Sequence, residues 1–199
     1  MTHFFVGVDL GQRRDHTAIA VVEQSRGELL VRFLMRVPLG TPYPIVVDLV
    51  REVTAHEQLA GRCVAVVDAT GVGAPVVDML RNARLGCEVV PVTITGGDKE
   101  SGSHLGWSVP KKDLIAGVQV ALERGELKIA KELKDAGALM RELGDMRMER
   151  HASGKVRMGA DGAGQHDDLV IALALAIWKA AKGPVKRNFF GTQRLPGIS

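Results

Sequence analysis

The chain has 199 residues, of which 26 are basic and 23 acidic, so its formal net charge is only +3. A hydrophobic fraction of 46% excludes a disordered chain, and the length suits one compact α/β domain. This charge does not by itself indicate nucleic-acid binding, because basic residues attract phosphates only where they gather on one face. The N-terminus lacks the pattern of a signal peptide and the apolar run at 170–178 is too short to span a bilayer, so we expect a cytoplasmic protein without a membrane partner.

Three short apolar runs begin the chain, at residues 3–9, 17–23 and 29–37, with turn residues between them. They predict a three-stranded antiparallel meander. Residues 44–60 have the apolar spacing of a helix, and the run at 62–68 is apolar without alternation. A run of that kind is typical of a strand that is buried on both faces.

Residues 71–86 predict a helix, with Pro75 in its first turn and Gly86 just past its end. The run at 87–94 predicts another buried strand. A polar, glycine-rich segment follows at 95–106, and we expect it to be the most mobile loop of the chain.

The C-terminal part predicts helices over about 110–124 and 131–147, and an apolar helix from 168 to about 182. Between the last two, residues 148–159 have the form of a hairpin that turns at 153–154.

No repeat or low-complexity linker interrupts this series of segments. We therefore expect residues 1–182 to form one domain and 183–199 to be a flexible C-terminal tail. The order of the segments predicts an α/β fold, in which a central mixed sheet has three antiparallel strands followed by parallel strands and helices cover both faces.

The two cysteines, Cys63 and Cys87, each lie in an apolar run that predicts a strand. Free cysteine behaves there as a small buried hydrophobic residue, so we expect reduced thiols.

Acidic residues stand where three of the predicted elements end or begin. Asp9 ends the first strand, Asp68 ends the fourth, and Asp167 and Asp168 open the last helix. Sites of open α/β sheets gather at the carboxyl ends of strands, so these side chains are expected to meet there. Four carboxylates at short range cannot all stay ionised without a cation.

The chemistry of this group indicates hydrolysis of a phosphodiester bond. Carboxylate oxygens suit Mg²⁺ or Mn²⁺, and two such ions about 4 Å apart can activate water and stabilise the leaving oxygen. We therefore predict that Asp9, Asp68 and Asp168 are catalytic, and that Asp167 joins them in binding the metal.

Each of these residues also has a structural interpretation. Asp167 or Asp168 would serve equally well as the cap of the last helix, where carboxylates are favoured. Asp9 and Asp68 would serve as ordinary turn residues. The combination at one predicted edge of the sheet favours a functional site.

Further polar residues are weaker candidates. His166 would support a metal ligand or carry a proton, although a histidine in front of a helix more often makes a local hydrogen bond. Basic residues that would hold DNA phosphates, unless they form an ordinary solvated face, are Arg13, Arg14, Lys111, Lys112, Arg147, Arg150, Lys155 and Arg157.

Four segments of the chain, in order over about residues 5–178, resemble the nuclease domain of terminase large subunits: VGVDLG, VAVVDATGVGAPVVDML, VPKKDLIAGVQVALERGELKIA and GQHDDLVIALALAIW. The resemblance implies a ribonuclease H-like fold and a two-metal endonuclease that cuts double-stranded DNA during genome packaging. It also implies that Asp9, Asp68, Asp167 and Asp168 bind the two Mg²⁺ or Mn²⁺ ions. The setting would be a bacterial host of a phage or prophage, with a separate terminase ATPase, the small subunit and the portal as partners.

The chain departs from complete large subunits in one respect. They carry an ATPase domain upstream, whereas this sequence begins at the first predicted nuclease strand. We therefore expect nuclease activity without ATP hydrolysis.

Three other functions share parts of this pattern. A nucleotide-binding module of the actin and hexokinase type also has a first strand that ends in Asp-x-Gly, but it needs two related lobes. A Holliday-junction resolvase has the same fold and metals, with a four-way junction as substrate. A DNA-binding or assembly protein without activity would retain the carboxylates for folding alone.

Overall fold

The computed structural model describes residues 3–11, 15–71, 73–103, 105–152 and 166–183, and for 73–74 and 147–152 it describes the backbone alone. Eight strands form one sheet, in the order β6-β7-β5-β4-β1-β2-β3-β8. The strands are β1 (His3–Asp9), β2 (Ala18–Ser25), β3 (Glu28–Arg36), β4 (Cys63–Asp68), β5 (Glu88–Thr95), β6 (Ser101–Ser103), β7 (Gly106–Pro110) and β8 (Leu127–Ile129). The helices are α1 (Tyr43–Ala55), α2 (Gly73–Asn82), α3 (Lys111–Glu123), α4 (Ala136–Ala152) and α5 (Asp168–Ala181).

The predicted meander is confirmed, because β1 pairs antiparallel with β2 and β2 antiparallel with β3. On its other side β1 pairs parallel with β4, and β4 pairs parallel with β5. The register places Val8 opposite Val67, so the next residues, Asp9 and Asp68, end neighbouring strands at the same edge. The mixed sheet therefore has the arrangement that the sequence predicts.

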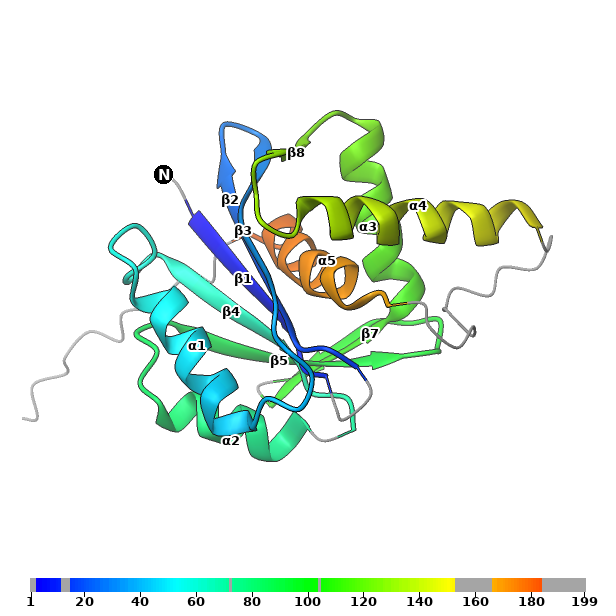
Figure 1. Ribbon diagram of the computed structural model, residues 1–199. Coiled ribbons are helices and arrows are strands. Elements are labelled where there is room, and N and C mark those ends of the chain that lie inside the picture. The colour runs from blue at the N-terminus through cyan, green and yellow to red at the C-terminus, as the bar shows by residue number, and fades with distance from the viewer. Residues whose placement is uncertain (1–2, 12–14, 72, 104, 153–165, 184–199) are drawn as a thin grey trace, which may run out of the picture.

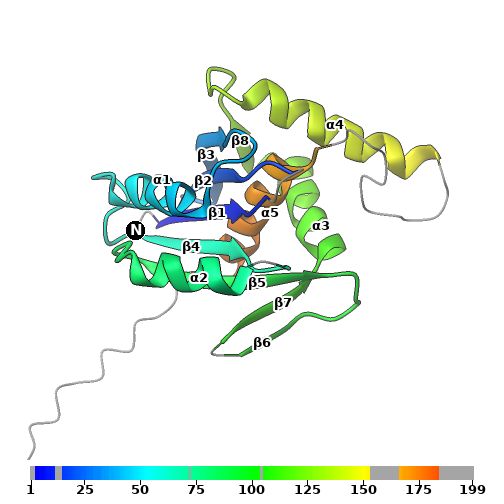
Figure 2. The same cartoon turned by 60° about the horizontal axis from the view of Figure 1, so that its bottom comes forward.

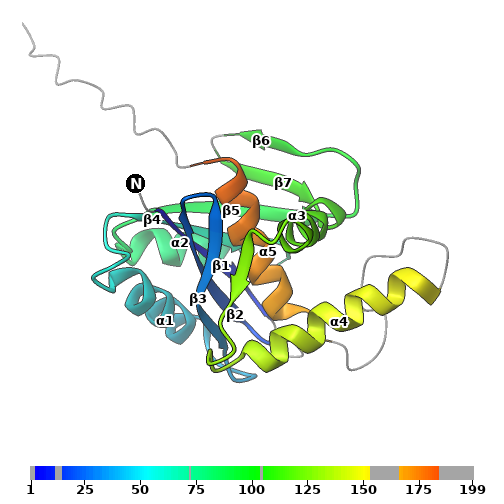
Figure 3. The same cartoon turned by 90° about the horizontal axis from the view of Figure 1, so that it is seen from above.

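Helices cover both faces of the sheet (Figures 1 and 3): α1 and α2 lie on one face, and α3, α4 and α5 on the other. Alternate residues of β1 supply two separate cores. Phe5 packs in the core beneath α5, whereas Phe4 and Val6 pack in the core beneath α1 and α2. Both faces of the central strands are buried, which explains their unalternating sequence.

Helix α5 is the central helix of its layer, and all its residues from Asp168 to Ala180 are buried. A helix that is apolar all round belongs inside the protein, as its composition predicts. It crosses β1 at very short range, because a Cβ atom built on Gly7 would lie 1.9 Å from the carbonyl oxygen of Ala172. Glycine is required at this position by the approach of the helix backbone.

The sequence-based prediction missed three of the strands. Residues 95–106, expected to form a mobile loop, contain β6 and lead into β7, which extend the sheet beyond β5 (Figure 2). The segments SGS and GWSVP lack the alternation that marks a strand, and they form strands because they pair with a neighbour. The three residues of β8 were also not predicted, and they are ordered by parallel pairing with β3.

The boundaries of α1, α2 and α4 also differ from the sequence-based prediction. Helix α1 ends at Ala55 instead of 60, since His56 already has an extended backbone (ψ 137°). Helix α2 spans only Gly73–Asn82. The predicted hairpin at 148–159 is wrong in its first arm, because α4 continues to Ala152, as Met, Arg and Glu favour. The predicted turn at 153–154 and the rest of the hairpin lie outside the described residues.

The two cysteines carry free thiols. Cys63 is buried at the start of β4, whereas Cys87 is half-buried and precedes β5. Within the described part of the chain, no helix combines the length and the apolar character that a membrane crossing requires.

The substitution Gly7→Ala should lower the free energy of unfolding by about 2 kcal/mol or more, because the new methyl group forces α5 away from β1. Gly117→Ala in α3 is the matched control: a Cβ there has no neighbour within 4 Å, so stability should be unchanged or raised by up to about 1 kcal/mol. Urea denaturation of both variants measures the difference. Equal midpoints would contradict the close approach of α5 to β1.

Candidate functional site

The site is built where two strand ends and one helix start meet. Asp9 and Asp68 are the last residues of the neighbouring parallel strands β1 and β4. Asp167 is the N-cap residue of α5 and Asp168 its first residue. Because α5 crosses β1 at Gly7, its N-terminus comes to the edge at which Asp9 lies. The structure therefore brings together the acidic residues that the sequence singled out.

The electrostatics of Asp9 show that the four carboxylates interact. Burial raises the pKa of Asp9 well above its usual value, and repulsion from Asp68, Asp168 and Asp167 raises it further. The ammonium group of Lys111 acts in the opposite direction. A carboxyl group in such surroundings holds its proton unless a cation replaces it.

The side chain of Asp68 is oriented by Thr70 and interacts with Asp9. Burial, the largest effect, raises its pKa, while hydrogen bonds with Thr70 and with Asp9 lower it. Thr70 donates to Asp68 Oδ1 from its hydroxyl group (2.5 Å) and from its backbone N–H (2.8 Å), and the Thr70 hydroxyl accepts a bond from Ile94 N–H (2.8 Å). The turn interpretation of Asp68 is therefore correct for one carboxylate oxygen, and these bonds fix the orientation of the side chain toward Asp9.

The capping interpretation is wrong for Asp167. Asp167 makes no side-chain cap bond to the helix within the described residues; instead its Oδ2 accepts a bond from Lys111 Nζ (2.7 Å). The N–H of Val170, in the first turn of α5, donates to Glu142 Oε2 of α4 (3.0 Å). The side chain of Asp167 therefore does not cap the helix, whereas Asp168 lies in the first turn, where the helix dipole favours a carboxylate.

Asp168 is a buried carboxylate with cationic surroundings. Its side chain is 6% exposed, and Oδ2 has no hydrogen-bond partner in the described parts of the chain. His166 Nδ1 lies 3.7 Å from this atom and Arg36 Nε 3.9 Å. Burial raises the pKa of Asp168, while His166 and Arg36 lower it.

His166 thus lies where the sequence-based hypothesis put it, next to a predicted metal ligand. The sequence did not identify His16, whose ring packs edge-on against His166 (5.3 Å between centroids) and whose charge also lowers the pKa of Asp168. It also did not identify Arg36 or Glu142. These residues come from distant segments, and no local pattern links them to the acidic cluster.

The two predicted DNA-binding residues whose side chains are described, Lys111 and Lys112, lie in different surroundings. Lys111 lies inside the carboxylate cluster, as its bond to Asp167 shows. Lys112 forms an ion pair with the exposed Asp98 instead, on the protein surface. The positions that fall outside the described residues or side chains are Arg13, Arg14, Arg147, Arg150, Lys155 and Arg157.

The donor set fits a divalent cation. It consists of oxygen ligands only, it includes an unpartnered buried oxygen of Asp168, and its mutual repulsion would be relieved by positive charge. As the side chains stand, no three Asp, Glu, His or Cys residues of the described segments form a group that could hold a metal ion. Lys111 supplies positive charge to the cluster in this arrangement.

Comparison with solved structures places this architecture among ribonuclease H-like nucleases of viral terminases. The large terminase nuclease from thermophilic phage G20c with bound magnesium is 26% identical, with a TM-score of 0.63 over 89% of this chain and 82% of that one. The human cytomegalovirus terminase nuclease domain, Mn soaked and inhibitor bound, is 13% identical, with a TM-score of 0.58 over 90% and 82%. The ribonuclease H-like fold predicted from the sequence is confirmed.

The resemblance to terminase large subunit nucleases is likewise confirmed. The large terminase from another thermophilic bacteriophage, 16% identical with a TM-score of 0.59, matches 90% of this chain over 40% of its own length. No family model and no curated protein matches the sequence.

The raised pKa values predict how stability varies with pH. Where the pKa of a carboxyl group is higher in the folded than in the unfolded state, folding binds protons, and stability falls as pH rises above the usual value of 3.8. In EDTA, the contribution of this cluster to stability should therefore fall as pH rises above the usual carboxyl pKa. Asp9→Asn removes one of the repelling charges and should flatten this loss.

Thermal unfolding of wild type and variant in EDTA checks this, with Asp48→Asn, an exposed residue of α1, as control. Asp9→Asn should be more stable relative to wild type at alkaline pH than at acidic pH, because the variant lacks one of the repelling charges. Parallel curves for the Asp9 variant and wild type would contradict the assignment of repulsion to this cluster.

Proposed function

We propose that the chain is a metal-dependent endonuclease that cleaves double-stranded DNA, with Asp9, Asp68 and Asp168 as its catalytic residues. The likeness to terminase nucleases suggests a nuclease. The observation that supports this site is the convergence of four carboxylates at the joint edge of β1, β4 and α5, where burial and then their mutual repulsion raise the pKa of Asp9.

The proposed cofactors are two Mg²⁺ or Mn²⁺ ions, held by the three catalytic aspartates and Asp167. The similar nuclease of phage G20c has been solved with bound magnesium and the cytomegalovirus terminase nuclease domain after a manganese soak, which supports this choice for the present chain. When bound, such ions activate a water molecule and stabilise the leaving oxygen of a phosphodiester.

The protein's own residues would prepare this chemistry. Thr70 orients Asp68 by binding one of its oxygens, which leaves the other for a ligand. Lys111, which pairs with Asp167, would turn to a DNA phosphate once a cation takes over its role toward the carboxylates. His166, next to Asp168, would hold or release a proton close to the site.

The proposed biological role is cutting of DNA during viral genome packaging, in the cytoplasm of a bacterial host. The partners would be duplex DNA and, if the resemblance extends to the assembly, a separate terminase ATPase, the small subunit and the portal.

Incubation with supercoiled plasmid in Mn²⁺, Mg²⁺ or EDTA tests the proposal. Wild-type protein should nick and linearise the plasmid only with metal. The double variant Asp9→Asn, Asp168→Asn should lose more than about 100-fold of the rate, since removal of groups that merely support metal ligands already costs 10–100-fold. Asp48→Asn, Asp78→Asn, two exposed helix residues purified in the same way, controls for contaminating nuclease.

Two results would contradict the proposal: no cleavage by wild type with either metal, or equal cleavage by the double variant. A four-way DNA junction belongs in the same assay. Preference for the junction over linear duplex would instead assign the chain to the resolvases, which share the fold and the metals.

A further inference from the structure

The N-terminus of α5 is capped by another helix. The first N–H groups of a helix lack partners within it, and the side chain of the N-cap residue usually binds one of them. Here Glu142 of α4 accepts the bond from Val170 N–H (3.0 Å), and Asp167 in the N-cap position does not. Glu142 is only 5% exposed, so this is a buried contact. Both aspartates at the helix start are thereby left for other ligands.

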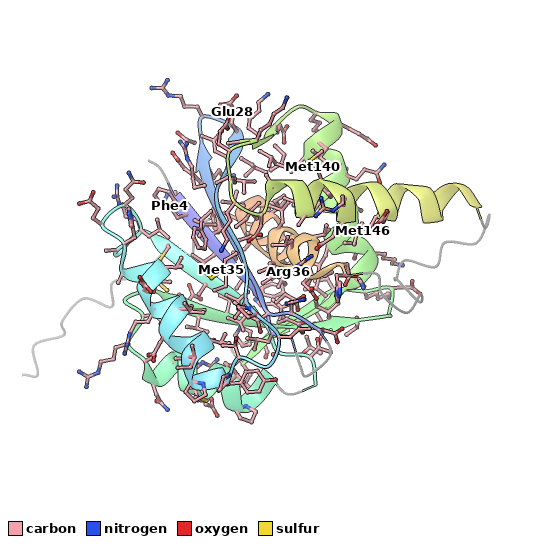
Figure 4. The ribbon with its side chains drawn as sticks, in the orientation of Figure 1. Phe4, Glu28, Met35, Arg36, Met140 and Met146 are labelled. Carbon is pink, nitrogen blue, oxygen red and sulfur yellow. The ribbon has the colours of Figure 1, made fainter. Side chains whose placement is uncertain are left out.

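Arg36 at the end of β3 holds Glu142 in place. Its Nη2 forms an ion pair with Glu142 Oε1, and its backbone N–H donates to Asp135 Oδ2, in front of α4 (3.0 Å). Strand β3 thus holds α4 at two points. Figure 4 shows Arg36 beside α5, whereas its neighbour Met35 packs on the opposite face of the sheet.

Arg36 also faces Asp168. Its Nε lies 3.9 Å from Asp168 Oδ2, a distance too long for a hydrogen bond but short enough for strong attraction between opposite charges. Both atoms are buried, and neither has a hydrogen-bond partner in the described segments. A buried oxygen without a partner costs free energy, and its persistence in a folded protein calls for a reason.

We propose that Arg36 and Glu142 are positioning residues of the metal site: Glu142 caps α5 in place of Asp167, and Arg36 fixes Glu142 while it faces the unpartnered oxygen of Asp168. This inference rests on the proposed function, because the free oxygen is assigned to a metal ion. It adds that the position of α4 governs metal affinity, although α4 supplies no metal ligand.

Two substitutions at Glu142 distinguish its ion pair with Arg36 from its cap on the Val170 N–H. Glu142→Gln keeps an oxygen for Val170 N–H and nearly the same shape, but it loses the charge that holds Arg36. Glu142→Ala also loses the cap. The matched control is Glu23→Gln, because Glu23 of β2 forms an ion pair with Arg32 of β3, whose side chain is exposed.

The experiment combines Mn²⁺ titration calorimetry of the full chain with hydrogen exchange of the Val170 amide. Glu142→Gln should weaken Mn²⁺ binding about 10-fold and leave Val170 protected, and Glu142→Ala should weaken it by up to about 100-fold and expose Val170 to exchange. Glu23→Gln should bind as wild type. In the plasmid assay, Glu142→Gln should need correspondingly more Mn²⁺ for half-maximal nicking, with thermal stability in EDTA checked for each variant.

Two outcomes would contradict this inference, and they distinguish its failure from that of the proposed function. If Val170 loses protection in Glu142→Ala while both Glu142 variants bind Mn²⁺ as wild type does, the cap is only structural; the inference is then wrong and the proposed nuclease stands. If wild-type protein binds no Mn²⁺, the proposed function is wrong and this inference falls with it.

Discussion

The close contact between Gly7 and Ala172 determines where the acidic residues of this protein meet. Gly7 lies two residues before the end of β1, and Ala172 lies about one helical turn after the start of α5. Their contact therefore brings the start of the helix to the end of the strand. Parallel pairing of β1 with β4 then adds Asp68 from the neighbouring strand. The carboxylate cluster is a consequence of this packing, because each residue occupies the end of an element whose place the core dictates.

Gathering carboxylates at a buried edge is unfavourable by itself, since burial and repulsion both oppose their ionised form. The surrounding residues offset part of this cost. Thr70 satisfies one oxygen of Asp68, Lys111 pairs with Asp167, and Arg36 and His166 face Asp168. The remaining unfavourable energy is what a divalent cation would remove.

Much of the fold could be predicted because local patterns report burial. The unalternating run of β4 predicted a strand that is buried on both faces, and four of its six residues are buried; the mostly apolar run of α5 predicted a helix, which is buried from Asp168 to Ala180. The strands β6, β7 and β8 were not predictable in this way. They are short and they exist through pairing with β5 and β3, which an isolated segment does not reveal. The boundary of α4 was missed because its charged end has no amphipathic pattern to mark where it stops.

The sequence by itself determined the mixed sheet, its central strands and the four aspartates at element ends, since these follow from apolar periodicity and from residue chemistry. Only the tertiary structure decided what each aspartate does. Asp167 could have been a helix cap, but Lys111 binds it and Glu142 takes that task. Glu142 and its partner Arg36 are 106 residues apart in the chain. Hydrogen bonds and ion pairs act over a few ångströms, so such partners are chosen by the packing of whole elements, which no local pattern in the sequence encodes.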